Sequence, residues 1–86
     1  MMKINYGYRK DGEEQMTNTS KLKGAIVEKG MLQEAVAMQL GMTSATFNYK
    51  VNNKTEFKAS EIKKLAEILH LTKEEVFAIF FADEVE

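Results

Sequence analysis

The sequence contains no cysteine, no proline and no tryptophan, and only one histidine among its 86 residues. Without cysteine, neither a disulfide nor the usual thiolate metal site can form, and His70 has no second imidazole with which to share a metal ion. No run of about 18 apolar residues predicts a membrane span, and the N-terminal residues lack the apolar stretch of a signal peptide. We therefore expect a cytoplasmic protein that needs no metal or cofactor and contacts no membrane.

The signals of enzymes are also scarce. The chain has no nucleophilic cysteine, no glycine-rich phosphate loop and no paired acids at a spacing that suggests a pocket. Hydrophobic residues make up 44% of the chain, which is enough for a compact fold, and a chain of this length supports one domain. We therefore expect a small binding domain with no catalytic residues.

The net charge of −1 hides an uneven distribution of charge along the chain. Residues 1–18 are neutral overall, whereas residues 19–65 hold eight lysines against four glutamates, a net charge of +4. Residues 66–86 hold one lysine against six acids, a net charge of −5. A phosphate backbone would favour the basic middle of the chain and repel its acidic end.

Helical spacing of apolar residues runs through residues 19–82 and no proline interrupts it. This pattern predicts an all-α fold, a compact bundle of about five short helices. The expected helices span residues 20–29, 32–40, 44–51 and 59–69, and a fifth begins after residue 72. Residues 1–18 show no sustained period and are interpreted as a flexible N-terminal arm, and residues 83–86 as an acidic tail.

Most of the expected helix ends have suitable capping residues. Thr19 or Ser20 can cap the first helix, and Gly30 suits the left-handed stop after it. Thr43 is placed to cap the third helix. Leu32 stands before the second helix, where Ser, Thr or Asp would be preferred, so that helix is expected to start without a side-chain cap.

The fifth helix has a clear start and an ambiguous far end. Thr72 and Glu75 have the spacing of a capping box. Beyond them, Phe77, Phe80 and Phe81 belong to an apolar cluster that is larger than one buried face of a short helix. These rings could complete the core of the monomer or form a self-association surface, and we expect a homodimer that uses them.

The third expected helix has two different faces. At about 100° per residue, Phe47 and Val51 share the buried direction. The opposite face lacks the glutamates and lysines of an ordinary solvated helix, and it consists of Ser44, Ala45, Asn48 and Tyr49, with Thr46 at its side. Between residues 44 and 55 the only charges are those of Lys50 and Lys54. Amide, hydroxyl and methyl groups can bind base edges, and acids would be repelled by phosphates.

The connection before this helix supports the same interpretation. Two helices that cross steeply need a small residue where they touch and a flexible residue between them, and Ala37 and Gly41 supply both. The segment QEAVAMQLGMTSATF (33–47) resembles the helix-turn-helix of lambda-repressor-like, Xre-type DNA-binding domains. Its flanks, SKLKGAIVEKG (20–30), NNK (52–54) and EIKKLAEILHLTKEEV (61–76), resemble the small phage repressor-like proteins of Gram-positive bacteria and their prophages.

Carried over by position, the resemblance implies a sequence-specific transcriptional regulator that binds double-stranded DNA. Gln33 would bond a phosphate and support the third helix, whose outer face would meet base edges, and the loop after it would meet the second strand. The residues implied at the DNA surface are Gln33, Thr43, Ser44, Ala45, Thr46, Asn48, Tyr49, Lys50, Asn52, Asn53 and Lys54. The residues implied in the core are Leu22, Ile26, Val36, Phe47, Val51, Ile62 and Leu65. The family often has glycine where this chain has His70.

Other interpretations stay open. The same fold could serve a protein-binding modulator that captures another repressor protein, or an antitoxin-like module. The short side chains of Ser44 and Ala45, the acidic tail and the apolar fifth helix favour such a role. Lys50, Lys54 and Lys58 could equally be ordinary solvated surface charge.

Overall fold

Five helices make up most of the chain between residues 17 and 82, the part that the structure, a computed structural model, describes. They are α1 (Thr19–Glu28), α2 (Gln33–Gln39), α3 (Ser44–Val51), α4 (Ala59–Leu69) and α5 (Lys73–Val76), and α5 continues into a π-helical segment, η1 (Phe77–Phe81). Residues 17–82 contain no strand. The all-α fold predicted from periodicity is therefore confirmed, and the bounds predicted for the third and fourth helices match those of α3 and α4.

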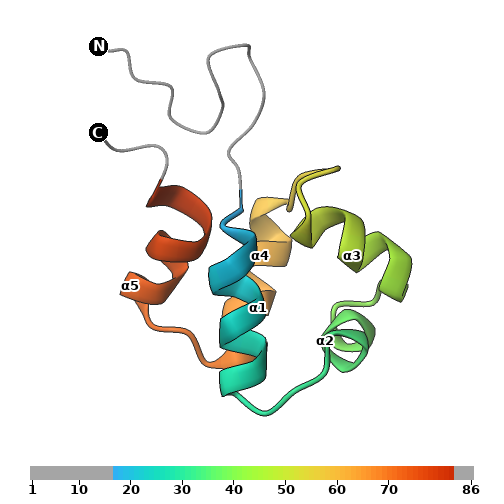
Figure 1. Ribbon diagram of the computed structural model, residues 1–86, viewed down its shortest axis with the longest axis horizontal. Helices are drawn as coiled ribbons and strands as arrows, with labels where there is room; N and C mark the ends of the chain where they lie inside the picture. The colour runs from blue at the N-terminus through green and yellow to red at the C-terminus, as the bar shows by residue number, and fades with distance from the viewer. Residues whose placement is uncertain (1–16, 83–86) are drawn as a thin grey trace, which may run out of the picture.

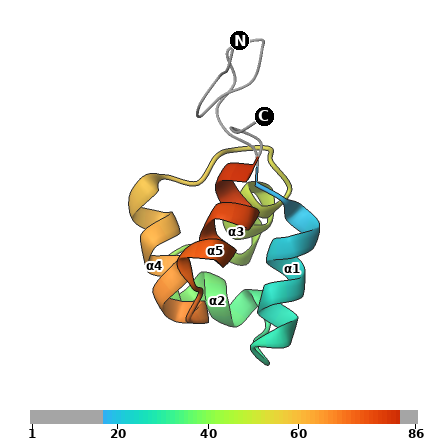
Figure 2. The ribbon, with the colours of Figure 1, turned by 90° about the vertical axis from the view of Figure 1, so that its left-hand side faces the viewer.

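The helices surround a shared core. α1 and α5 lie together on one side of the molecule, and α3 lies on the opposite side of α1 (Figure 1). α5 is seen between α1 and α4, with α3 behind it (Figure 2). α2 packs against α3 and α4, and α1 packs against η1 and α3. Of the helices in residues 17–82, none has the length and hydrophobicity that crossing a membrane requires.

The core combines apolar side chains from every helix except α5. Its buried members are Leu22, Ala25, Ile26, Val36, Ala37, Phe47, Val51, Phe57, Ile62, Leu65, Leu69, Ile79 and Phe80. All seven core residues predicted from the sequence are among them. Phe57, in the loop before α4, is an addition: its ring packs edge-on against Phe47 and Phe80, with centroids 5.9 and 5.6 Å apart.

The aromatic rings at the end of the chain divide between core and surface. Phe80 is only 1% exposed and lies in the core of its own chain. Phe81 is half-buried, and Phe77 is 46% exposed. The expectation that Phe80 forms a self-association surface is therefore wrong. The sequence pattern could not separate these rings, because burial at this end depends on how α5 and η1 lie on the core.

The start of the folded unit also differs from the prediction. Asn18, and neither Thr19 nor Ser20, caps α1, because its side chain accepts a hydrogen bond from the Lys21 amide. The Asn18 amide donates to the carbonyl of Ile79 over 2.7 Å, and Thr17 is buried. Thr17 and Asn18 therefore belong to the folded unit rather than to the predicted arm. The rest of that arm, and the tail 83–86, lie outside the described residues.

Several helix ends agree with the sequence analysis. Thr72 and Glu75 form the predicted capping box of α5. Leu32 stands before α2 without a side-chain cap and is 66% exposed. Gly41 has a φ of 78°, which lets the chain turn between α2 and α3. His70 has a φ of 54° at the end of α4, a left-handed conformation in which glycine would be unstrained.

Candidate nucleic-acid interface

α3 is fixed to the molecule by one face and by its first turn. Phe47 is 1% exposed and Val51 is fully buried, so this side of the helix lies in the core. At the start, the Thr43 hydroxyl accepts a hydrogen bond from the Thr46 amide over 3.1 Å and donates to the Thr46 hydroxyl over 3.0 Å. The predicted cap is confirmed, and it satisfies one of the unpaired amides at the helix start.

The opposite face of α3 is open to solvent. Ser44, Ala45, Thr46, Asn48 and Tyr49 are all exposed, and the exposed fraction of the Tyr49 side chain is 54%. The division between buried and exposed faces predicted from helix geometry is therefore confirmed. This face holds hydroxyl, amide, methyl and phenol groups and no carboxylate.

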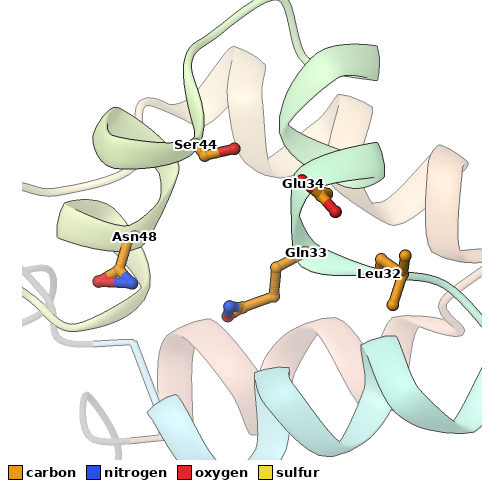
Figure 3. A pocket seen from close by; sticks show the side chains of 5 residues that line it. All are labelled: Leu32, Gln33, Glu34, Ser44 and Asn48. Atoms are coloured by element: carbon orange, nitrogen blue, oxygen red, sulfur yellow. The ribbon is translucent and has the colours of Figure 1, made fainter.

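A groove of about 310 Å³ separates the start of α2 from α3. Ser44 and Asn48 form one side of it, and Leu32, Gln33 and Glu34 form the other (Figure 3). The Gln33 side chain extends across the groove toward Asn48. Its Oε1 is buried and has no hydrogen-bond partner among residues 17–82, which is uncommon for a buried polar atom. The structure thus brings together three of the predicted residues, Gln33, Ser44 and Asn48, at one groove.

Two asparagines at the end of α3 are joined by their side chains. The Asn52 amide nitrogen Nδ2 donates to Oδ1 of Asn48 over 2.7 Å and to the Asn48 carbonyl over 3.0 Å. These bonds hold the oxygen end of the Asn48 carboxamide, while the residue itself is exposed. Asn52 therefore positions Asn48, a role that the sequence did not indicate.

Asn53 is exposed, but its carboxamide is hydrogen-bonded within the protein. Its Oδ1 accepts from the Thr17 amide over 2.8 Å, and its Nδ2 donates to the Thr17 carbonyl over 2.9 Å. The expected contact between this side chain and a phosphate is corrected, because both polar atoms of the carboxamide bind the start of the folded unit. The Thr19 hydroxyl adds a bond to the Val51 carbonyl over 2.7 Å, so the same junction ties the end of α3 to α1.

The two lysines predicted at this surface have different environments. The Lys50 ammonium forms an ion pair with Glu61 at 3.1 Å, and only 11% of its side chain is exposed. It also donates to the carbonyl of Glu56 over 2.9 Å. Lys50 therefore holds α3 to the segment that leads into α4, and its ammonium is used within the protein instead of at the predicted DNA surface. Lys54 is exposed in the loop, as the prediction requires.

Leu32 and Glu34 complete the groove around Gln33 and were missed as members of the surface. Only the sequence position of Leu32 and Glu34 beside Gln33 could have indicated that they line the groove, because neither side chain is typical of a DNA contact. Within residues 17–82, no group of three or more metal-binding side chains lies together. The site is a concave surface formed by two helices that pack against each other, and it combines the polar side chains of Gln33, Ser44 and Asn48 with Leu32 and Glu34.

The structure thus defines an all-helical domain whose third helix presents a polar, acid-free face. A family model matches residues 16–83, and the family is described as a protein of unknown function (DUF739). Because the match covers most of the chain and every described residue, the protein belongs to this family. A comparison with curated proteins finds no match.

Proposed function

We propose that the protein is a sequence-specific DNA-binding transcriptional regulator of the phage or prophage repressor type, acting in the cytoplasm. In this proposal α2 and α3 form a helix-turn-helix, and α3 enters the major groove of an operator. The observation that carries the proposal is the exposed face of α3. It has no carboxylate, whereas its opposite face is anchored in the core by Phe47 and Val51.

The chemistry of this face suits base edges in the major groove. An asparagine can bond adenine through N6 and N7, and the methyl group of alanine can pack on the methyl group of thymine. Asn48 and Ala45 are the residues assigned to these contacts. Ser44 and Thr46, at the first turn of α3, are assigned to bases or to the adjacent phosphates.

Charge supports the same orientation on DNA. The basic segment 19–65 contains α3, whereas the acids are concentrated in residues 66–86. Because Lys50 is used inside the protein, Lys54 supplies the only exposed positive side chain between residues 44 and 55. We therefore expect few phosphate contacts from this region and a modest dependence of binding on salt.

Binding to DNA is tested first at low salt, where the electrostatic contribution is strongest. Labelled random-sequence duplexes are titrated with the protein by fluorescence anisotropy, and bound duplexes are then selected through several rounds and sequenced. The proposal expects measurable binding and enrichment of a defined sequence. Binding no stronger than that of a neutral control protein would overturn it.

A second function is a protein-binding modulator that captures another repressor. The observation in its favour is the outer surface of α2, where Met38 is 77% exposed. Ala35 and Met42 join Met38 in a largely apolar groove of about 380 Å³. The withdrawal of Lys50 from the surface also reduces the charge available to DNA. Two results together would favour this function. The protein would form a complex with a candidate repressor, measured by sedimentation, and it would show no affinity for DNA.

A further inference from the structure

A further groove is lined by residues of α1, α5 and η1 and by none of α3. Its volume is about 380 Å³, and α1 supplies Lys21, Gly24, Ala25 and Glu28 to it, while Glu75 and Ala78 line the other side. The spacing of the four α1 residues places them on one face of that helix. The groove therefore has small residues at its centre and charged residues at its ends.

Gly24 is the most informative of these residues. It lies inside α1, where glycine costs about 1 kcal/mol relative to alanine. A Cβ atom added to Gly24 would meet no atom of residues 17–82 within 4 Å, so packing within this part of the chain does not require glycine here. Close approach of another backbone to this point would account for glycine at position 24.

The charges show which partner fits. If a second α1 lies antiparallel across the first, with the two-fold axis between Gly24 and Ala25, each Gly24 lies opposite Ala25 of the second copy. The same register places Lys21 of each copy opposite Glu28 of the other. One stripe is thus complementary to itself, as a two-fold symmetric interface requires. We propose that this groove is a self-association surface and that its occupant is α1 of a second copy of the chain.

This surface differs from the aromatic one expected from the sequence, which stays a prediction for Phe77 and Phe81. Phe80 is buried in the monomer, and only Phe77 among the three rings is largely exposed. α3 lies on the other side of α1 from α5 (Figure 1), and no residue of α3 lines the groove. Self-association by this route does not depend on DNA binding and is measured without DNA.

The first test is steric. Sedimentation equilibrium of the full chain, from micromolar to about millimolar concentrations, is expected to show a monomer–dimer equilibrium. Gly24→Gln fills the groove with a long side chain, and we expect it to weaken the dimer by at least about tenfold. Circular dichroism should show an intact fold, because a Cβ atom at this position meets nothing within 4 Å among residues 17–82. A wild-type chain that stays monomeric throughout this range would overturn the proposal.

The second test is specific for the antiparallel register. Lys21→Glu and Glu28→Lys should each weaken the dimer, because each places like charges opposite each other, and the double variant should restore the original affinity. Neither change threatens α1, since an acid in the first turn and a base in the last turn both suit the helix dipole. Lys23→Glu is the matched control, because Lys23 is exposed on α1 but does not line the groove. Single variants that dimerise like the wild type, or a double variant that does not recover, would contradict the proposed register.

Discussion

The carboxamide of Asn53 binds both backbone groups of Thr17, accepting from the amide over 2.8 Å and donating to the carbonyl over 2.9 Å. These two residues are 36 positions apart in the sequence, and Thr17 is only 6% exposed. Asn53 also has a φ of 65°, which asparagine tolerates better than most residues. The junction therefore joins the beginning of the folded unit to the loop after α3.

Asn53 should accordingly be important for stability. Asn53→Ala removes both hydrogen bonds to Thr17 and a longer one to the Thr19 hydroxyl. It also places alanine in a left-handed conformation. We expect the free energy of unfolding to fall by about 2–4 kcal/mol, measured by urea denaturation. Asn53→Gly keeps the backbone conformation but loses the hydrogen bonds, so we expect its free energy of unfolding to fall by roughly 1–2 kcal/mol. An equal loss of unfolding free energy in both variants would show that the backbone conformation of residue 53 contributes nothing. Lys54→Ala, at an exposed neighbouring position, is the control and should leave stability unchanged.

His70 should be a position where glycine stabilises the protein. Its φ of 54° places a residue with a Cβ atom in the left-handed region at the end of α4. Relief of that strain is partly offset by the greater freedom of glycine in the unfolded chain, so we expect His70→Gly to raise stability by up to about 1 kcal/mol. The melting temperature would rise by a few degrees. His70→Ala should bring no gain, and a gain equal to that of glycine would contradict the backbone explanation.

Lys50 and Lys54 should separate structural from DNA-binding roles. Lys50→Gln breaks the ion pair with Glu61, and we expect it to lower the free energy of unfolding by about 1–2 kcal/mol. The slope of log affinity against log salt should stay unchanged for Lys50→Gln, whereas Lys54→Gln should reduce it by about one. The slope is measured by anisotropy with any duplex that the protein binds. A reduced slope for Lys50→Gln would show that Lys50 contacts a DNA phosphate.

The two ends of the aromatic cluster should respond differently to truncation. Phe80 is fully packed and contacts the Phe57 ring edge-on at a centroid distance of 5.6 Å, so Phe80→Ala should cost about 3–5 kcal/mol. Phe77 is 46% exposed, and Phe77→Ala should cost about 1 kcal/mol or less. Thermal or urea unfolding at micromolar concentration measures both. Similar losses for the two variants would show that the assignment of core and surface is wrong.

The parts of the fold that the sequence predicted best are those set by local spacing. The bounds of α3 and α4, the capping box at Thr72 and Glu75 and the exposed face of α3 follow from residues within one or two turns of each other. Phe57 was missed because it lies in a loop and belongs to no periodic pattern. Its burial depends on helices that meet only in three dimensions.

The errors at the site have the same physical cause. Lys50 lies in α3 and Asn53 in the loop after it. Both were assigned to the DNA surface because the helix beside them was expected to bind DNA. Their partners, Thr17 and Glu61, lie elsewhere in the sequence. A polar side chain that satisfies a distant backbone or charge leaves no local signal, so only the folded chain distinguishes it from a surface contact.

The central claim is that the exposed face of α3 reads a DNA sequence, and Asn48 is the residue that tests it most directly. Its exposed side chain is held by Asn52 and makes no contribution to the core. The measurement is the affinity of wild type and Asn48→Ala for the selected duplex and for a scrambled duplex of equal length, at one salt concentration. We expect a loss of about 1–3 kcal/mol on the selected duplex and none on the scrambled one. An unchanged affinity for both duplexes, with the fold intact, would contradict the account.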